Sequence, residues 1–178
     1  MRDQDEAFIR QAIQIAIRAG KEGHNPFGSI LVHEGVVIEE GSNDANNPLG
    51  SFGHAEFNLI HKSVKKYSDT YLGTCTLYTS TAPCVRCLMA IASAGIPRIV
   101  YSVSYEKFAL IQPIPMVQRD YPRLLGELGI EMEMIGPILE EEGLAAYAYR
   151  GGKYRPLEEV LEDFAQQRAQ YMENQRKE

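Results

Sequence analysis

Two short motifs constrain this chain of 178 residues more than any other feature. A His-Ala-Glu triplet begins at His54, and a Pro-Cys-Val-Arg-Cys run begins at Pro83, with 26 residues between the two motifs. The proline and the apolar run after it predict the start of a helix, since proline is tolerated in a first helical turn. Cys84 and Cys87 then lie one turn apart and can share one metal ion, which the fold must bring close to His54.

His54, Cys84 and Cys87 offer the imidazole and thiolate ligands that zinc takes, so the predicted cofactor is Zn²⁺. Three protein ligands leave a fourth position for water, which is typical of catalytic zinc, whereas structural zinc is normally closed by four protein ligands. Glu56 can point into the same space without being a ligand. We therefore predict Glu56 as the catalytic residue that moves protons. The alternative is that Glu56 is a solvated carboxylate, or one that caps the first turn of its helix.

The cysteines allow two other interpretations. Cys84 and Cys87 have the spacing of a redox dithiol, but that interpretation gives His54 and Glu56 no role. Cys75 lies in a strand-like run and would make the zinc site structural if it were a fourth ligand. A buried, inert cysteine is the commoner fate of such a residue. The pattern favours catalytic zinc, with Cys75 in the core.

The order H-x-E and then P-C-x-x-C resembles the signature of the cytidine deaminase-like superfamily of zinc-dependent nucleobase and nucleoside deaminases. The resemblance implies an α/β fold, a three-layer α-β-α sandwich with a mixed central sheet of about five strands. The stretches 25–32 and 41–43 resemble bacterial guanine-type base deaminases. In those enzymes the asparagine at the position of Asn43 hydrogen-bonds the base, and the backbone at the position of Ala55 contacts the substrate. Phe27 is a further candidate for the pocket wall. The alternatives are a turn residue for Asn43 and a core residue for Phe27.

Two departures from the related pattern border the expected pocket. Relatives in the base and tRNA branches usually carry Asp-Pro-Thr-Ala before His-Ala-Glu, and this chain has Gly-Ser-Phe-Gly at 50–53. They usually carry glutamate before Pro-Cys, and this chain has Ala82. The resemblance therefore does not name the base.

Hydrophobic periodicity predicts the remaining elements. We expect helices at 5–20, 54–67, 84–94, 121–128, 139–149 and 156–172, a hairpin of strands at 29–33 and 36–40, and strands at 74–80, 98–101 and 130–135. This order favours an α/β sandwich with a mixed sheet.

We predict that the chain divides into two parts. Residues 1–150 form the catalytic domain, and residues 151–178 contain a C-terminal helix. The helix has an apolar stripe, and Gly151 and Gly152 before it can act as a hinge. The stripe can dock on its own chain or on a second copy. The guanine-type deaminases that the chain resembles are dimers with a swapped C-terminal segment, which implies a homodimer here. The stripe residues are Leu157, Val160, Leu161, Phe164 and Tyr171.

Composition narrows the class of partner. The net charge of −6 argues against a broad nucleic-acid interface, so a small-molecule substrate is expected and nucleic acid is not. No stretch has the length of a membrane span, and the polar N-terminus lacks a secretory signal. Three cysteines, two of them assigned to metal, fit a reducing compartment, the cytoplasm. The predicted function is hydrolytic deamination of a free nucleobase or nucleoside, of guanine or cytosine type. A tRNA adenosine deaminase and a non-catalytic, zinc-stabilised binding protein are the alternatives.

Overall fold

The computed structural model describes residues 2–44, 46, 50–115 and 120–176. Its centre is a five-stranded sheet in the order β2-β1-β3-β4-β5. β1 pairs antiparallel with both β2 and β3, whereas β3, β4 and β5 run parallel, so the sheet is mixed as predicted. The strands are β1 (Gly28–His33), β2 (Val36–Ser42), β3 (Thr76–Thr81), β4 (Arg98–Val103) and β5 (Glu133–Ile135).

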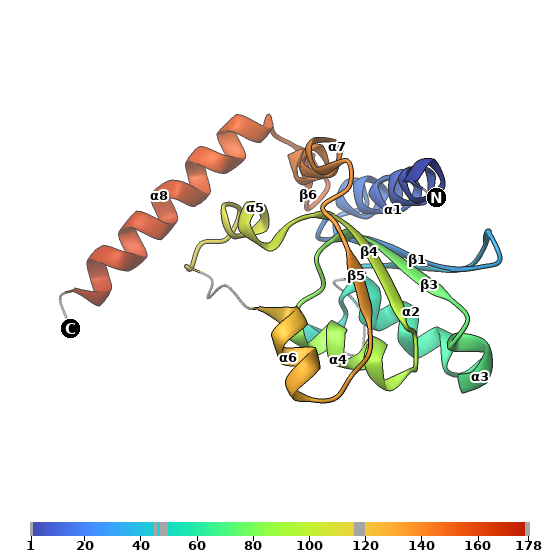
Figure 1. Cartoon of the computed structure of the whole chain (residues 1–178). Helices are drawn as coiled ribbons and strands as arrows, with labels where there is room; N and C mark the ends of the chain where they lie inside the picture. Colours follow the sequence, from blue (N-terminus) through green and yellow to red (C-terminus); the bar gives the residue numbers. More distant parts are fainter. Residues whose placement is uncertain (1, 45, 47–49, 116–119, 177–178) are drawn as a thin grey trace.

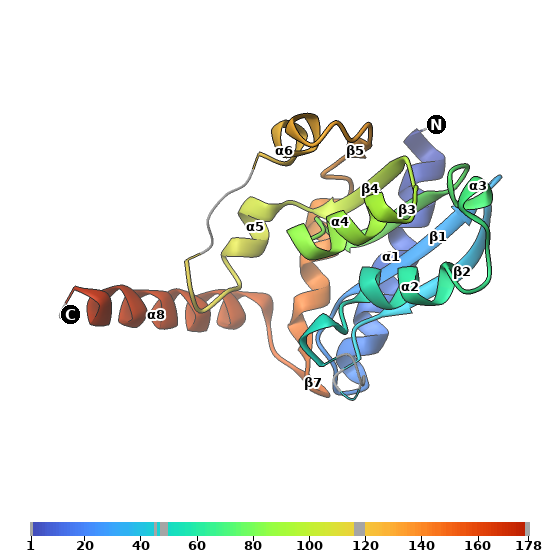
Figure 2. The same ribbon diagram turned by 90° about the horizontal axis from the view of Figure 1, so that it is seen from below.

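Helices cover both faces of this sheet (Figures 1 and 2). α1 (Arg2–Lys21) lies on one face, and α2 (Ala55–Ser63) and α4 (Val85–Ser93) lie on the other. Successive strand residues point to opposite faces, so each face has its own apolar core. Leu31, Leu77 and Ile99 pack under α2 and α4, while their neighbours Ile30, Tyr78 and Val100 pack under α1. The three-layer α-β-α sandwich is confirmed.

Short elements account for most differences from the predicted boundaries. α3 (Asp69–Leu72) and α5 (Tyr105–Ala109) are too short to leave a helical period in the sequence. Of the strand expected at 130–135, only the three residues of β5 pair with a neighbouring strand, β4. The expected helix at 139–149 is α7 (Glu140–Leu144) followed by a 3₁₀ turn over Ala145–Ala148. The helix at 121–128 is confirmed as α6 (Tyr121–Glu127).

The glycine pair ahead of the last helix forms a hairpin turn. β6 (Tyr149–Arg150) pairs with β7 (Lys153–Tyr154), and both glycines have positive φ, 58° and 76°, as a tight two-residue turn requires. The Gly152 N–H donates to the Gly20 carbonyl at 2.9 Å, which fixes the turn to the end of α1. The stretch is therefore bound to the body of the domain.

The last helix, α8 (Leu157–Gln175), begins against the body and then projects away from it (Figure 1). Val160 is buried in an apolar cluster with Leu144 and Tyr147. Farther along, the Arg168 guanidinium donates to the Gln112 carbonyl at 3.0 Å. The first part of the stripe thus docks on its own chain, while the division at residue 150 and the swap stay predictions. No helix in the described part of the chain is long and apolar enough to cross a membrane.

Candidate active site

The three predicted ligands converge where α2 and α4 begin. His54 is the residue before α2, Cys84 the residue before α4, and Cys87 lies in the first turn of α4. His54 Nδ1 lies 3.6 Å from Cys84 Sγ and 3.5 Å from Cys87 Sγ, and the two sulfurs are 3.6 Å apart. Neither His54 nor Cys84 caps its helix through the side chain, so both side chains are directed to each other instead.

These separations fit one tetrahedral zinc ion. Bond lengths of about 2.3 Å to sulfur and about 2.0–2.1 Å to nitrogen, at tetrahedral angles, place neighbouring ligand atoms about 3.5–3.8 Å apart. The three observed separations lie in that range. Within the described residues, the cluster able to hold a metal consists of His54, Cys84 and Cys87. The three side chains therefore have the geometry of a three-ligand zinc site.

The electrostatics of the cluster favour a cation. The hydrogen bond between the two sulfurs lowers the pKa of Cys84 and raises the pKa of Cys87. The bond to Cys84 also raises the pKa of His54, against the effect of burial. A lowered pKa favours the thiolate form of Cys84, which is the form that binds metal.

Asn58 holds the loop that delivers His54. Its side-chain amide donates to the carbonyls of Ser42 at 2.8 Å and Gly53 at 3.2 Å, which ties the end of β2 and the residue before His54 to α2. Gly41 lets β2 pass close to the start of α2, because a Cβ there would lie 2.3 Å from the Ala55 carbonyl oxygen. Our sequence analysis missed Asn58, since an asparagine inside a helix carries no motif.

Glu56 lies beside the metal cluster and outside it. Only 6% of the residue is exposed, and its Oε1 accepts a hydrogen bond from Thr79 Oγ1 at 2.9 Å. Burial raises the pKa of Glu56. Cys75 is buried elsewhere, and its thiol donates to the Tyr71 carbonyl at 3.4 Å. The structure thus places Glu56 at the edge of the metal cluster and Cys75 in the core, and proton transfer by Glu56 stays a prediction.

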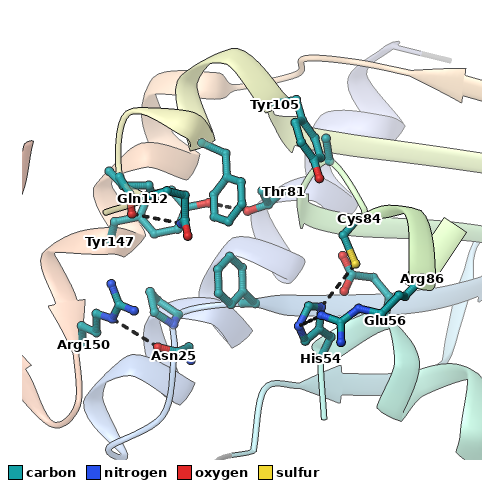
Figure 3. A pocket seen from close by; sticks show the side chains of 15 residues that line it. Asn25, His54, Glu56, Thr81, Cys84, Arg86, Tyr105, Gln112, Tyr147 and Arg150 are labelled. Atoms are coloured by element: carbon teal, nitrogen blue, oxygen red, sulfur yellow. Dashed lines mark hydrogen bonds between the residues drawn. The ribbon is translucent and has the colours of Figure 1, made fainter. Parts of the chain in front are cut away.

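A cavity of about 340 Å³ opens onto this cluster (Figure 3). Phe27, Tyr105, Phe108 and Tyr147 contribute aromatic rings to its walls, among polar and small residues. Phe27 lies edge-on to Phe108 and Tyr147, with ring centroids 5.7 and 5.9 Å away. Tyr147 is buried and its hydroxyl bonds with Thr81 Oγ1 at 2.5 Å. Asn25, Glu56, Arg86, Tyr105, Gln112 and Arg150 also line the cavity.

The predicted substrate contacts differ in their placement. Phe27 lines the cavity. Asn43 and Ala55 are buried nearby and lie outside the set of described residues that line it. The Asn43 backbone N–H donates to the Phe27 carbonyl at 3.2 Å, so Asn43 supports the segment that carries Phe27. Substrate contact by Asn43 and Ala55 stays a prediction.

The sequence analysis missed the far wall of the cavity. Tyr105, Phe108, Tyr147 and Arg150 all come from the part of the chain after β4. The sequence after β4 contains aromatic residues, but their spacing does not relate them to the motifs at His54 and Pro83. Their place in the cavity wall could therefore not be predicted.

Comparison with known proteins agrees with this geometry. The family model described as "Cytidine and deoxycytidylate deaminase zinc-binding region" matches residues 2–103, which span both motifs. A probable cytosine deaminase of Schizosaccharomyces pombe is 32% identical over 151 residues, covering 80% of this chain and 89% of that protein.

Two other relatives differ in their named substrates. A guanine deaminase of Bacillus subtilis is 35% identical over 107 residues, 58% of this chain and 67% of that one. A tRNA-specific adenosine deaminase of Aquifex aeolicus is 30% identical over 102 residues, 57% and 68% of the two chains. Among solved structures, the guanine deaminase of Nitrosomonas europaea superposes with a TM-score of 0.65 at 18% identity, covering 88% and 84%, which supports the fold.

Proposed function

The chain belongs to the family of the cytidine and deoxycytidylate deaminase zinc-binding region and is a hydrolytic deaminase, and from this premise we propose that it deaminates a free nucleobase or nucleoside of guanine or cytosine type. The observation that carries the proposal is the buried carboxylate of Glu56 beside a three-ligand zinc site in one aromatic cavity. The proposed site residues are His54, Cys84 and Cys87 for zinc, Glu56 for catalysis, and Phe27, Asn43 and Ala55 for substrate.

The chemistry divides between the metal and Glu56. A zinc ion held by His54, Cys84 and Cys87 would act as a Lewis acid that makes water available as a nucleophile at neutral pH. Glu56 accepts a proton from the attacking water and passes it to the ring nitrogen next to the attacked carbon. Glu56 next takes the second proton from the hydroxyl group now on the attacked carbon and gives it to the exocyclic amine. The C–N bond then breaks, ammonia leaves and the carbonyl forms. Thr79 holds the carboxylate in place, and burial raises the pKa of Glu56.

The shape and charge of the cavity support a small planar substrate. Phe27, Phe108 and Tyr147 offer ring faces and edges against which a heterocycle can stack. The volume of about 340 Å³ is at the lower end of small-molecule pockets. The net charge of −6 also disfavours the salt-dependent phosphate contacts by which nucleic-acid binders gain affinity.

A tRNA adenosine deaminase is the second candidate, because relatives named for that activity are as similar as those named for free bases. Deaminases of both kinds need the same ligands and carboxylate, so the metal site does not separate them. A binding protein without catalysis is the weaker alternative, since such a protein needs no buried Glu56.

A panel of substrates tests the proposal. Zinc-loaded protein is incubated with guanine, cytosine and adenine, with their ribonucleosides and 5′-monophosphates, and with a tRNA anticodon stem-loop, and ammonia is measured. We expect release from at least one free base, nucleoside or nucleotide and none from the RNA. Release from the RNA alone would contradict the proposal and favour the tRNA alternative.

We also propose a homodimer, on the basis of the part of α8 that projects from the body and carries Tyr171 and the 44% exposed Met172 (Figure 1). Sedimentation equilibrium should give twice the 20.0 kDa mass of the chain. A mass of one chain across the micromolar range would refute the dimer and leave α8 as ordinary packing.

A further inference from the structure

Two positively charged side chains, Arg150 and Lys153, lie on the hairpin of β6 and β7. In the register of β6 and β7, Arg150 lies directly opposite Lys153. Directly opposed residues in an antiparallel pair project from the same face, and like charges in that position are destabilising. An anion seated between the two side chains would remove that repulsion.

Arg150 is held in place by uncharged partners. Its Nε donates to Asn25 Oδ1 at 3.2 Å, and its guanidinium lies 5.5 Å from the centroid of the Phe164 ring on α8. Across the described residues, the ion pairs found involve neither Arg150 nor Lys153. The charge of Arg150 is therefore available to an anionic ligand.

Arg150 also stands between two cavities. It lines the active-site cavity and, with Tyr147, a second cavity of about 220 Å³ that Lys153 and Arg155 also line. The carboxylate in the second cavity, Asp163, is bonded to Arg155 at 2.9 Å. The second cavity is thus net positive, in a chain whose net charge is −6.

We propose that Arg150 and Lys153 bind a phosphate group that the substrate carries on its sugar. This inference rests on the proposed function for the place of the ring, and it extends the proposed nucleoside substrate by a phosphate on its sugar. Figure 3 shows Arg150 and Asn25 at one end of the cavity and His54, Glu56 and Cys84 at the other. A nucleotide with its ring beside Glu56 would direct its phosphate toward Arg150, and Lys153 lines the second cavity that Arg150 also lines.

The residue types match phosphate better than a single carboxylate. A phosphate monoester carries close to two negative charges at neutral pH and so complements two opposed cations. The planar guanidinium of Arg150 can bind two phosphate oxygens at once, while Lys153 contributes a point charge. A singly charged carboxylate would leave one of the two cations uncompensated.

Binding of ribose 5-phosphate, with ribose for comparison, tests the site independently of the base and of turnover. ³¹P NMR titrations use zinc-loaded wild type, Arg150→Gln, Arg150→Lys and the control Arg123→Gln, whose side chain is 75% exposed on α6. We expect Arg150→Gln to weaken binding about 10- to 100-fold, the size of a lost charged hydrogen bond. Arg150→Lys should lie between, and Arg123→Gln should match wild type.

The outcomes separate this inference from the proposed function. Equal binding by wild type and Arg150→Gln, or no binding by wild type, overturns the phosphate site whatever the deamination panel gives. Binding that depends on Arg150, with no ammonia from any small molecule, supports the phosphate site and refutes the proposed function. When both hold, kcat/KM for the preferred nucleoside 5′-monophosphate exceeds that for its nucleoside, and Arg150→Gln removes the difference.

Discussion

Replacing Glu56 by glutamine is expected to lower turnover by about 10²- to 10⁴-fold, the usual contribution of a positioned acid–base group. Glutamine has nearly the same shape and can still accept a hydrogen bond from Thr79, which now bonds Glu56 at 2.9 Å. It cannot accept and return a proton at neutral pH. The loss should therefore fall on kcat, and KM should change little.

Zinc content and a matched variant make this experiment decisive. Glu56→Gln should keep one zinc per chain and its melting temperature should be at least that of wild type, because the change removes a buried carboxylate whose charge is disfavoured by burial. Glu131→Gln, an exposed position before β5, should leave turnover unchanged. Near-normal turnover in Glu56→Gln with zinc bound would show that another group moves the proton.

The metal half of the site could be predicted because its geometry is local. Cys84 and Cys87 are placed by a single helical turn, and His54 and Glu56 by a second helix start. The sheet then needs only to set the two helix starts side by side, which follows when α2 and α4 cover the same face. Residue type and spacing were sufficient for that prediction.

The opposite wall of the cavity could not be predicted for a physical reason. Phe27 and Tyr147 meet across 120 residues, and their contact depends on where α7 and the 3₁₀ turn dock beside α1. Such docking is decided by packing between distant surfaces, which leaves no period in the sequence. The glycine pair at 151–152 shows the same limit, since its hydrogen bonds to His24 and Gly20 distinguish a fixed turn from a hinge.

Local rules also fail at the two helix starts in an informative way. Ser, Thr, Asp and Asn are the preferred residues before a helix, and Ser68, Ser104 and Asp120 cap α3, α5 and α6 through their side chains. His54 and Cys84 occupy the same position before α2 and α4 without capping them. These two helices lack the stabilisation that a side-chain cap would give. Residues that break a local rule in this way are expected at functional sites, here as metal ligands.

The cysteines permit a direct test of that assignment, with Cys84→Ser compared against Cys75→Ser. Loss of the Cys84 thiolate leaves two of the three ligands, and the affinity for zinc should fall by at least about 100-fold, more than the loss of an outer-shell partner. After dialysis against a mild chelator, Cys84→Ser should contain little zinc by atomic absorption and release no ammonia. Its melting temperature should also no longer respond to added zinc.

Cys75→Ser changes the same atoms in the core of the protein, where the thiol lies against the Tyr71 carbonyl and 1% of the residue is exposed. It should keep one zinc per chain and normal turnover, since serine can still donate to that carbonyl. Zinc loss in Cys75→Ser would mean that four ligands close the site, and the three-ligand assignment on which catalysis depends would be wrong. Zinc loss in Cys84→Ser alone is the result that an open, catalytic position requires.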